Sequence, residues 1–238
     1  MKPSSIDQQQ IVNWFDQTYK RRKTNYLRPV DAYRIYLHLL EAKAGASLLD
    51  IACGPGQLLM VGKEQGLELH GIDISSEAIR QCQARLPEAK VQVANAEHLP
   101  FADQRFDYLT CLGSLERMID LEQVLREQVR VAKDDARFCY LVRNADAPSW
   151  KLVKQTLGIQ NHTGHQTAKS LVEWTTLFTQ VGLQIEAIYP DQWPLVRWRR
   201  WLSGQSSSID YTKIRKGWLP LNKAYEFIFL LKKNTPTK

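Results

Sequence analysis

The residues best suited to chemistry lie in two short segments about 20 residues apart. The first, Asp50–Gly56, has glycines at positions 54 and 56, where the absence of a Cβ lets a ligand approach the backbone closely. Backbone amides at the start of a following helix would face that ligand. The second segment ends at Asp73, whose carboxylate can accept hydrogen bonds from both hydroxyls of a ribose. Together the two segments predict a site for a nucleoside.

A dinucleotide site is the main alternative for this pattern. The full dinucleotide motif requires a third glycine three residues after Gly56, where Leu59 stands. Asp50 also places a negative charge at the end of the first segment's strand, which disfavours a pyrophosphate. A carboxylate in that place suits the ammonium group of a methionine moiety better. The residues therefore favour a nucleoside that carries an amino-acid tail.

The surrounding sequence alternates between strand and helix patterns. Strands are expected at 47–51, 67–72, 91–94, 106–112, 137–142, 183–189 and 225–231, and helices at 6–19, 29–42, 57–65, 75–86, 121–131 and 170–181. Ser75 is a plausible N-cap, and Asp134–Asp135 are expected to form the turn before the fifth strand. Such alternation predicts an α/β protein with a mostly parallel sheet and helices on both faces. Its ligand site should lie at the carboxyl ends of the strands.

Four segments, in order along the chain, resemble the motifs of class I S-adenosylmethionine-dependent methyltransferases. They are Leu49–Gly56, Gly71–Ser75, Asn95–Phe101 and Phe106–Glu116. The resemblance implies a seven-stranded, Rossmann-like sheet whose last strand is antiparallel and inserted between the fifth and sixth. It implies S-adenosylmethionine as cofactor, with S-adenosylhomocysteine as product and no metal. The residues it implies for the cofactor are Asp50, Ala52, Cys53, Gly54, Gly56, Asp73, Ile74, Asn95, Ala96, Glu97, Leu112 and Gly113.

Two positions depart from the family's pattern near the expected site. Asn95 stands where an acidic residue is common, although its amide oxygen can still accept from the adenine amino group. Arg117 stands where histidine often follows Leu-Glu, which removes a neutral base and adds a permanent cation.

A general base is needed only if the acceptor must lose a proton, and three residues are candidates. His162 and His165 lie in a glycine-containing loop after the fifth strand, and Glu116 follows the fourth. The alternatives are histidines bonded to backbone or water, and a capping or ion-paired Glu116. Other polar residues expected near the strand ends are Tyr19, Arg117, Arg143 and Asn144.

The expected organisation is an N-terminal helical segment, 1–44, that folds over the cofactor, followed by one methyltransferase domain, 45–238. A basic and aromatic insertion, 190–220, precedes the last strand. Its Trp/Arg-rich part 193–202 could be an acceptor lid, a cation–π surface, an interfacial anchor, an RNA-stacking surface or sheet packing. The four cysteines are too scattered for a metal site and are expected to be buried thiols. No apolar run or leader pattern is evident, so we expect a cytoplasmic protein.

The expected function is methyl transfer by in-line displacement to a small-molecule acceptor with an O-, N- or C-nucleophile. The net charge of +7 allows anionic or lipid-like acceptors. An RNA or protein methyltransferase is the weaker alternative, because no catalytic motif of those enzymes is found. A non-catalytic module that binds S-adenosylmethionine is the third. The acceptor and the oligomeric state stay open at this point.

Overall fold

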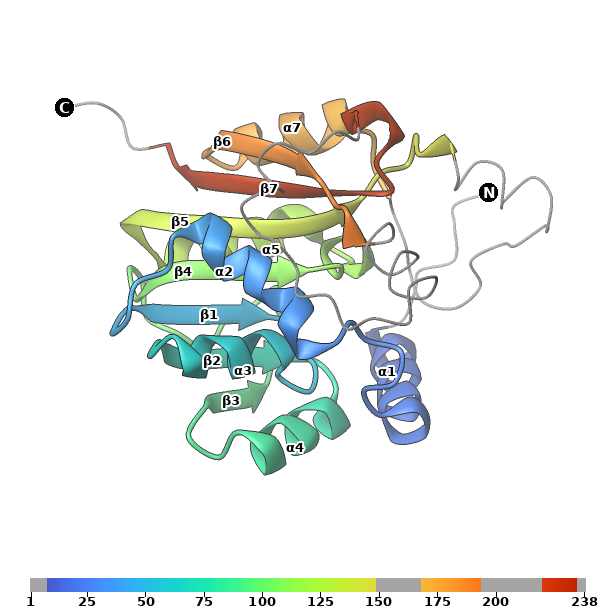
Figure 1. The fold of residues 1–238 in the computed structure, drawn as a ribbon, viewed down its shortest axis with the longest axis vertical. Coiled ribbons are helices and arrows are strands. Elements are labelled where there is room, and N and C mark those ends of the chain that lie inside the picture. The colour runs from blue at the N-terminus through green and yellow to red at the C-terminus, as the bar shows by residue number, and fades with distance from the viewer. Residues whose placement is uncertain (1–7, 149–167, 194–219, 235–238) are drawn as a thin grey trace.

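A single β-sheet forms the centre of the fold. The computed structural model describes residues 8–148, 168–193 and 220–234, and in these ranges seven strands form one sheet in the order β3-β2-β1-β4-β5-β7-β6 (Figure 1). Neighbouring strands are parallel except β7, which runs antiparallel between β5 and β6. The predicted fold class, including the inserted antiparallel last strand, is confirmed.

Strand bounds follow the hydrophobic pattern closely, except at β5. The strands are β1 Ser47–Ile51, β2 Glu68–Asp73, β3 Lys90–Val93, β4 Phe106–Leu112, β5 Ala132–Arg143, β6 Leu183–Pro190 and β7 Glu226–Lys233. The prediction of a turn at Asp134–Asp135 is wrong, because β5 already begins at Ala132. Between the pairs Phe106–Ala132 and Tyr108–Arg137 the register shifts. The extra residues form a bulge that leaves both aspartates exposed.

The helices are α1 Gln8–Arg22, α2 Arg34–Leu40, α3 Gln57–Glu64, α4 Ser76–Arg85, α5 Leu121–Val131 and α7 Leu171–Gln180. A 3-10 turn at Val30–Tyr33 replaces the first part of the helix predicted at 29–42. The predicted N-cap is confirmed, since the Ala78 amide donates to the Ser75 hydroxyl at 3.1 Å. Local sequence therefore sets most helix ends.

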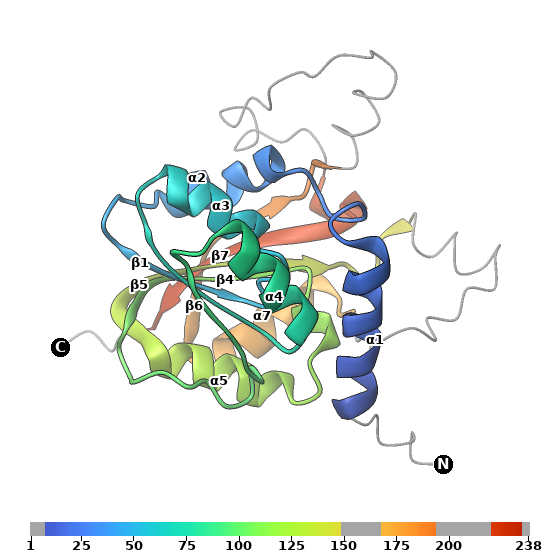
Figure 2. The ribbon, with the colours of Figure 1, turned by 90° about the horizontal axis from the view of Figure 1, so that it is seen from below.

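Helices cover both faces of the sheet (Figure 2). Helices α2, α3 and α4 bury one core, which includes Leu37, Leu58 and Leu69. Helices α5 and α7 bury the other, which includes Leu125 and Trp174. The four cysteines are free and buried, as expected. Among the described residues, no helix combines the length and apolar character needed to cross a membrane.

Helix α1 lies apart from both layers, at the carboxyl ends of the parallel strands (Figures 1 and 2). It is held against α4 by Asp16, whose Oδ1 accepts from the Ser75 hydroxyl at 2.5 Å and from the Glu77 amide at 3.2 Å. The Gln81 side chain also donates to the Tyr19 carbonyl at 3.1 Å. The N-terminal segment is thereby placed across the edge of the sheet where ligands bind in such folds.

Candidate active site

A crevice of two adjoining cavities opens between α1 and the carboxyl ends of the strands. The cavities enclose about 590 Å³ and 690 Å³ of empty space, open solvent included, which is a common size for small-molecule sites. We call the one beside Asp73 the ribose cavity and the one beside Asp50 the tail cavity. Both are lined by Phe15, Tyr19, Ala52, Ser114 and Arg117, so these residues mark the junction between them.

The structure brings together all predicted cofactor residues except Gly56. The ribose cavity is lined by Ala52, Asp73, Ile74, Asn95, Ala96 and Glu97. The tail cavity is lined by Asp50, Ala52, Cys53, Gly54, Leu112 and Gly113. Gly56 lies behind the crevice and forms the N-cap of α3.

The turn after β1 adopts a backbone that requires its glycines. Gly54 and Gly56 have φ of +53° and +82°, in the left-handed region. A Cβ on Gly54 would lie 2.9 Å from the Tyr19 hydroxyl, and one on Gly56 would lie 2.6 Å from the Cys82 Sγ. Gly54 thus lets α1 close onto the crevice, whereas Gly56 lets α3 pack against α4.

Replacing Gly56 by alanine is expected to destabilise the fold more than the same change at Gly182. Both residues have strongly positive φ, +82° and +85°, which costs an alanine about 1–2 kcal/mol. Only the Gly56 Cβ would also meet Cys82 and Leu86, adding roughly 1–3 kcal/mol of overpacking. Chemical denaturation of the two variants measures the difference. Equal losses would show that the contact with Cys82 is relieved without cost.

Asp73 is the best-placed acceptor in the crevice. Its Oδ2 accepts from the Gly54 amide at 2.8 Å, and its Oδ1 accepts from the Ser75 amide at 2.9 Å. Each carboxylate oxygen can accept more than one hydrogen bond, so both retain capacity for a ligand hydroxyl. Burial raises the pKa of Asp73 to about 6, against the stabilising amides of Ser75 and Gly54. The residue is therefore fixed in place with its oxygens at the ribose cavity.

Asp50 supplies a second buried carboxylate on the adjacent strand. Its Oδ1 accepts from the Thr110 hydroxyl at 2.7 Å. Burial raises the pKa of Asp50 to about 7; the Thr110 hydrogen bond lowers it and the nearby Asp73 raises it further. A cationic group entering the tail cavity would favour the ionised form of this carboxyl group.

The ligand-free protein is expected to lose stability as pH rises from 5 to 8. Asp50 and Asp73 have pKa values of about 7 and about 6 in the folded chain, but titrate near 4 when unfolded. The folded state therefore binds more protons in that window, and the free energy of unfolding falls by on the order of 1–4 kcal/mol. Denaturation at both pH values tests this. The fall in the free energy of unfolding between the two pH values should be smaller in Asp50→Asn. An unchanged fall in this variant would contradict the prediction.

The loop after β3 is held by its own side chains. The Asn95 Oδ1 accepts from the Glu97 amide at 3.0 Å, and the Glu97 carbonyl accepts from Gln123 Nε2 at 3.1 Å. The Glu97 carboxylate in turn accepts from the Asp120 amide at 3.2 Å. Asn95 thus shapes the loop first, and only its remaining lone pair is open to a ligand amino group.

Of the three predicted base candidates, only Glu116 lies among the described residues. Glu116 is fully buried in the 3-10 turn Leu115–Arg117 after β4 and lines neither cavity. Burial raises the pKa of Glu116, while Arg143 and Arg117 lower it. His162 and His165 lie outside the described residues, as does the Trp/Arg-rich segment apart from Trp193. The catalytic assignments of these three residues stay predictions.

Aromatic residues of the N-terminal segment form a wall that the sequence reasoning missed. Trp14, Phe15, Tyr26 and Tyr33 line the tail cavity. The spacing of the aromatics along α1 was the available signal, since residues three and four apart share a helix face.

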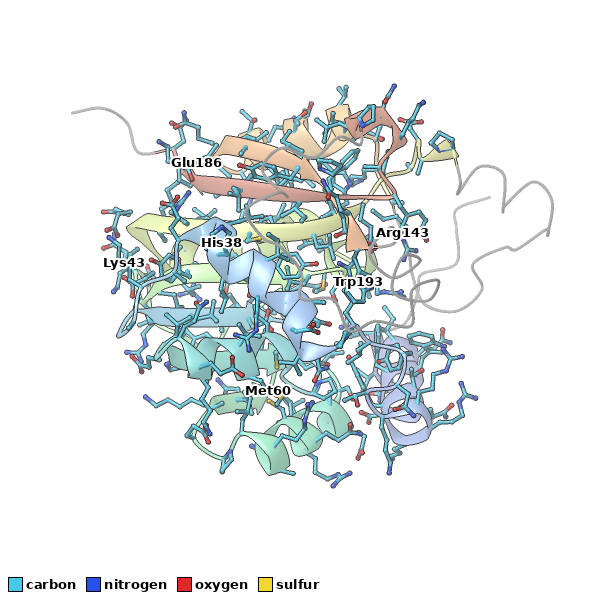
Figure 3. All side chains as sticks on the ribbon, viewed as in Figure 1. His38, Lys43, Met60, Arg143, Glu186 and Trp193 are labelled. Carbon is cyan, nitrogen blue, oxygen red and sulfur yellow. The ribbon has the colours of Figure 1, made fainter. Side chains whose placement is uncertain are left out.

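Arg28 ties this N-terminal segment to the far side of the sheet. Its guanidinium donates to both oxygens of Asp191, at 3.1 Å and 2.8 Å, to the Glu226 Oε2 at 2.7 Å and to the Tyr36 hydroxyl at 2.9 Å. Its Cζ lies 5.9 Å from the ring centroid of Trp193, which Figure 3 labels on the carboxyl-end side of the sheet. Burial raises the pKa of Glu226 to about 7, although Arg28 lowers it.

This sheet order, with a glycine turn after β1 and an acidic residue ending β2, defines a Rossmann-like enzyme class that binds an adenosine-containing ligand. Comparisons with known proteins narrow the class. Residues 49–140 match the family model described as "Methyltransferase domain". The YcgJ methyltransferase of Bacillus subtilis is 28% identical over 73% of this chain and 70% of its own length. Demethylmenaquinone methyltransferase of Listeria welshimeri is 32% identical over 49% of this chain. This match covers about half (53%) of that protein's own length.

Solved structures agree on the fold. A methyltransferase in complex with the Trm112 methyltransferase activator of Haloferax volcanii superimposes with a TM-score of 0.70 and 16% identity, covering 96% of this chain and 99% of that one. The chain therefore contains a class I S-adenosylmethionine-dependent methyltransferase domain, matched over residues 49–140. It is a methyltransferase that uses S-adenosylmethionine as its cofactor.

The crevice suits this cofactor on its own geometry. The ribose cavity presents a fixed carboxylate with free lone pairs, and the tail cavity presents another that a cation would ionise. Between them, Gly54 has no side chain, and the Tyr19 hydroxyl lies 2.9 Å from the place where its Cβ would be.

Proposed function

We propose that the enzyme transfers the methyl group to a small-molecule acceptor through an O-, N- or C-nucleophile. The observation that carries this proposal is the aromatic cover over the crevice. Helix α1 and the residues after it line the tail cavity with Trp14, Phe15, Tyr26 and Tyr33. A small molecule fits a cavity walled in this way, whereas a polymer would need an open groove that reaches the cofactor.

The proposed cofactor contacts follow from the two cavities. Asp73 binds the ribose hydroxyls, and Ile74 packs beside the ribose. Asn95, Ala96 and Glu97 border the adenine. Asp50 pairs with the ammonium group, and Gly54, Leu112 and Gly113 border the amino-acid tail. The sulfonium supplies an activated methyl carbon and a good leaving group, so the chain's own residues need only hold the acceptor in line and exclude water.

We further propose that residues 1–44 act as a lid. The Tyr19 ring lies over Gly54 and is 7% exposed, and its hydroxyl faces the crevice. Burial raises the pKa of Tyr19 well above its usual value, and Asp73 raises it further. This hydroxyl therefore stays protonated and can serve as a hydrogen-bond donor rather than as a base.

One of the relatives supports a small acceptor without identifying it for this chain. The demethylmenaquinone methyltransferase is named for a small molecule. The acidic or lipid-like character that we expect of the acceptor rests on the net charge of +7.

Labelled methyl transfer from S-adenosylmethionine into fractionated cell extract tests the proposal, with mass spectrometry of the labelled product. The expected result is label in the small-molecule fraction, reduced when the Asp73→Ala variant replaces the natural enzyme at low cofactor concentration. Label in RNA or protein would refute the small-molecule assignment. Cofactor binding by calorimetry with no label in any fraction would indicate a non-catalytic module.

A further inference from the structure

Arg117 occupies the junction between the two cavities. It ends the 3-10 turn after β4 and lines both the ribose cavity and the tail cavity. Its Cζ lies 5.8 Å from the ring centroid of Trp14 and 5.7 Å from that of Phe15, so the aromatic rings of α1 fix its position. The guanidinium is therefore held at the crevice rather than extended into solvent.

The charge of Arg117 is incompletely compensated there. Its Nη1 is buried and has no hydrogen-bond partner among the described residues. Burial lowers the pKa of Arg117, Glu116 raises it, Arg143 lowers it, and Tyr19 and Tyr26 raise it to a smaller extent. Burying a guanidinium nitrogen without a hydrogen-bond acceptor costs free energy. The site therefore favours a ligand that supplies such an acceptor to Arg117.

The position of Arg117 relative to the cofactor indicates which ligand supplies this hydrogen-bond acceptor. With the adenosine half beside Asp73 and the amino-acid tail beside Asp50, the sulfonium that joins them would lie near the residues shared by both cavities. Arg117 is one of these residues. Two cations in a partly buried site repel each other unless a negative charge lies with them.

We propose that Arg117 binds an anionic oxygen of the methyl acceptor, so that the acceptor is an acidic hydroxyl compound, such as a phenol or enol, and reacts as its oxyanion. This inference rests on the proposed small-molecule function. The acceptor hydroxyl releases its proton to water as it ionises on Arg117. An electron pair of the oxyanion, on oxygen or on a conjugated carbon, then forms the bond to the methyl carbon. The C–S bond breaks with its electron pair going to sulfur, and two neutral products result.

Such an acceptor makes a protein base unnecessary. Arg117 increases the ionised fraction of the acceptor at neutral pH, which is the part a histidine would otherwise play by removing the proton. A charge-assisted hydrogen bond from a guanidinium is roughly twice as strong as a neutral one and can align the oxygen as well.

Binding of 4-nitrophenol to the complex of enzyme and S-adenosylhomocysteine tests the proposal, because phenolate absorbance reports ionisation directly. For the natural enzyme we expect the phenolate to bind at least about tenfold more tightly than the neutral phenol, lowering the pKa of the bound phenol by about one unit. Arg117→Gln should lose this preference, and Arg117→Lys should retain part of it. Arg21→Gln, which removes an exposed charge from α1, should behave like the natural enzyme.

Cofactor analogues show whether the anion that binds Arg117 is the oxygen of the methyl acceptor or the carboxylate of the cofactor. Arg117→Gln should bind S-adenosylhomocysteine and 5′-methylthioadenosine, which lacks the amino-acid tail, as the natural enzyme does. At least tenfold weaker binding of S-adenosylhomocysteine alone would assign the guanidinium to the cofactor carboxylate and overturn the proposal. Equal phenolate binding by Arg117→Gln and the natural enzyme, or none by the latter at millimolar concentration, would also overturn it.

The label-transfer experiment above fails or succeeds independently of Arg117. Label found in RNA or protein would remove the proposed function, whereas label in small molecules that lack an acidic hydroxyl would remove only this inference. Thermal melts of Arg117→Gln and Arg117→Lys show that any lost binding comes from the site rather than from unfolding.

Discussion

Replacing Asp73 by alanine is expected to weaken S-adenosylmethionine binding by about 1–3 kcal/mol, a factor of roughly 5 to 150. Two ribose hydroxyls would lose their acceptor in a buried site, where water cannot fully replace it. The Gly54 amide would also lose its acceptor, at present 2.8 Å away, so the glycine turn itself would loosen. Isothermal titration with S-adenosylmethionine measures the loss.

Controls separate the ribose contact from the loss of local structure. Asp73→Asn keeps the shape and one acceptor oxygen, so its affinity should fall between those of the natural enzyme and the alanine variant. Asp103→Ala removes a carboxylate whose side chain is 73% exposed and should leave binding unchanged. Unchanged affinity in Asp73→Ala, with the fold intact, would refute the ribose assignment.

Replacing Arg28 by alanine is expected to lower the free energy of unfolding by about 3–5 kcal/mol. The change would leave the carboxylates of Asp191 and Glu226 buried without their cation, since their side chains are only 4% and 12% exposed. It would also release the N-terminal segment from the sheet. Denaturant unfolding measures the loss. Arg34→Ala is the matched control, because its ion pair with Glu64 is exposed and worth about 0–1 kcal/mol.

The loss in Arg28→Ala should depend on pH. Without the guanidinium, the folded-state pKa of Glu226 should rise further above its unfolded value, so protonation stabilises the folded variant at low pH and that stabilisation is lost as pH rises. The variant should therefore recover part of its stability at pH 5.5 relative to pH 8. Adding Asp191→Asn and Glu226→Gln to the Arg28→Ala variant should recover stability at both pH values. If Arg28→Ala lowers the free energy of unfolding no more than Arg34→Ala does, the cluster of Arg28, Asp191 and Glu226 contributes little to stability.

Local sequence alone determined the core of the cofactor crevice. The residues of β1, the turn around Gly54 and the end of β2 all lie between residues 47 and 73, and parallel strands bring their carboxyl ends to one edge. The positions of Asp50 and Asp73 at the crevice could therefore be predicted from strand pattern and motif. The N-cap Ser75 and the bounds of β4 and α5 were predicted for the same reason, because caps and hydrophobic periodicity act over a few residues.

Only the tertiary structure decided which distant side chains meet. Arg28 and its partners Asp191 and Glu226 are 163 and 198 residues apart in the chain, and no local pattern pairs them. Gly56 was expected to face the ligand, but α4 brings Cys82 against it instead. The position of the Arg117 guanidinium against Trp14 and Phe15 depends on α1 lying over the carboxyl ends of the strands. Contacts of this kind arise from the packing of separate elements, which spacing along a single chain does not encode.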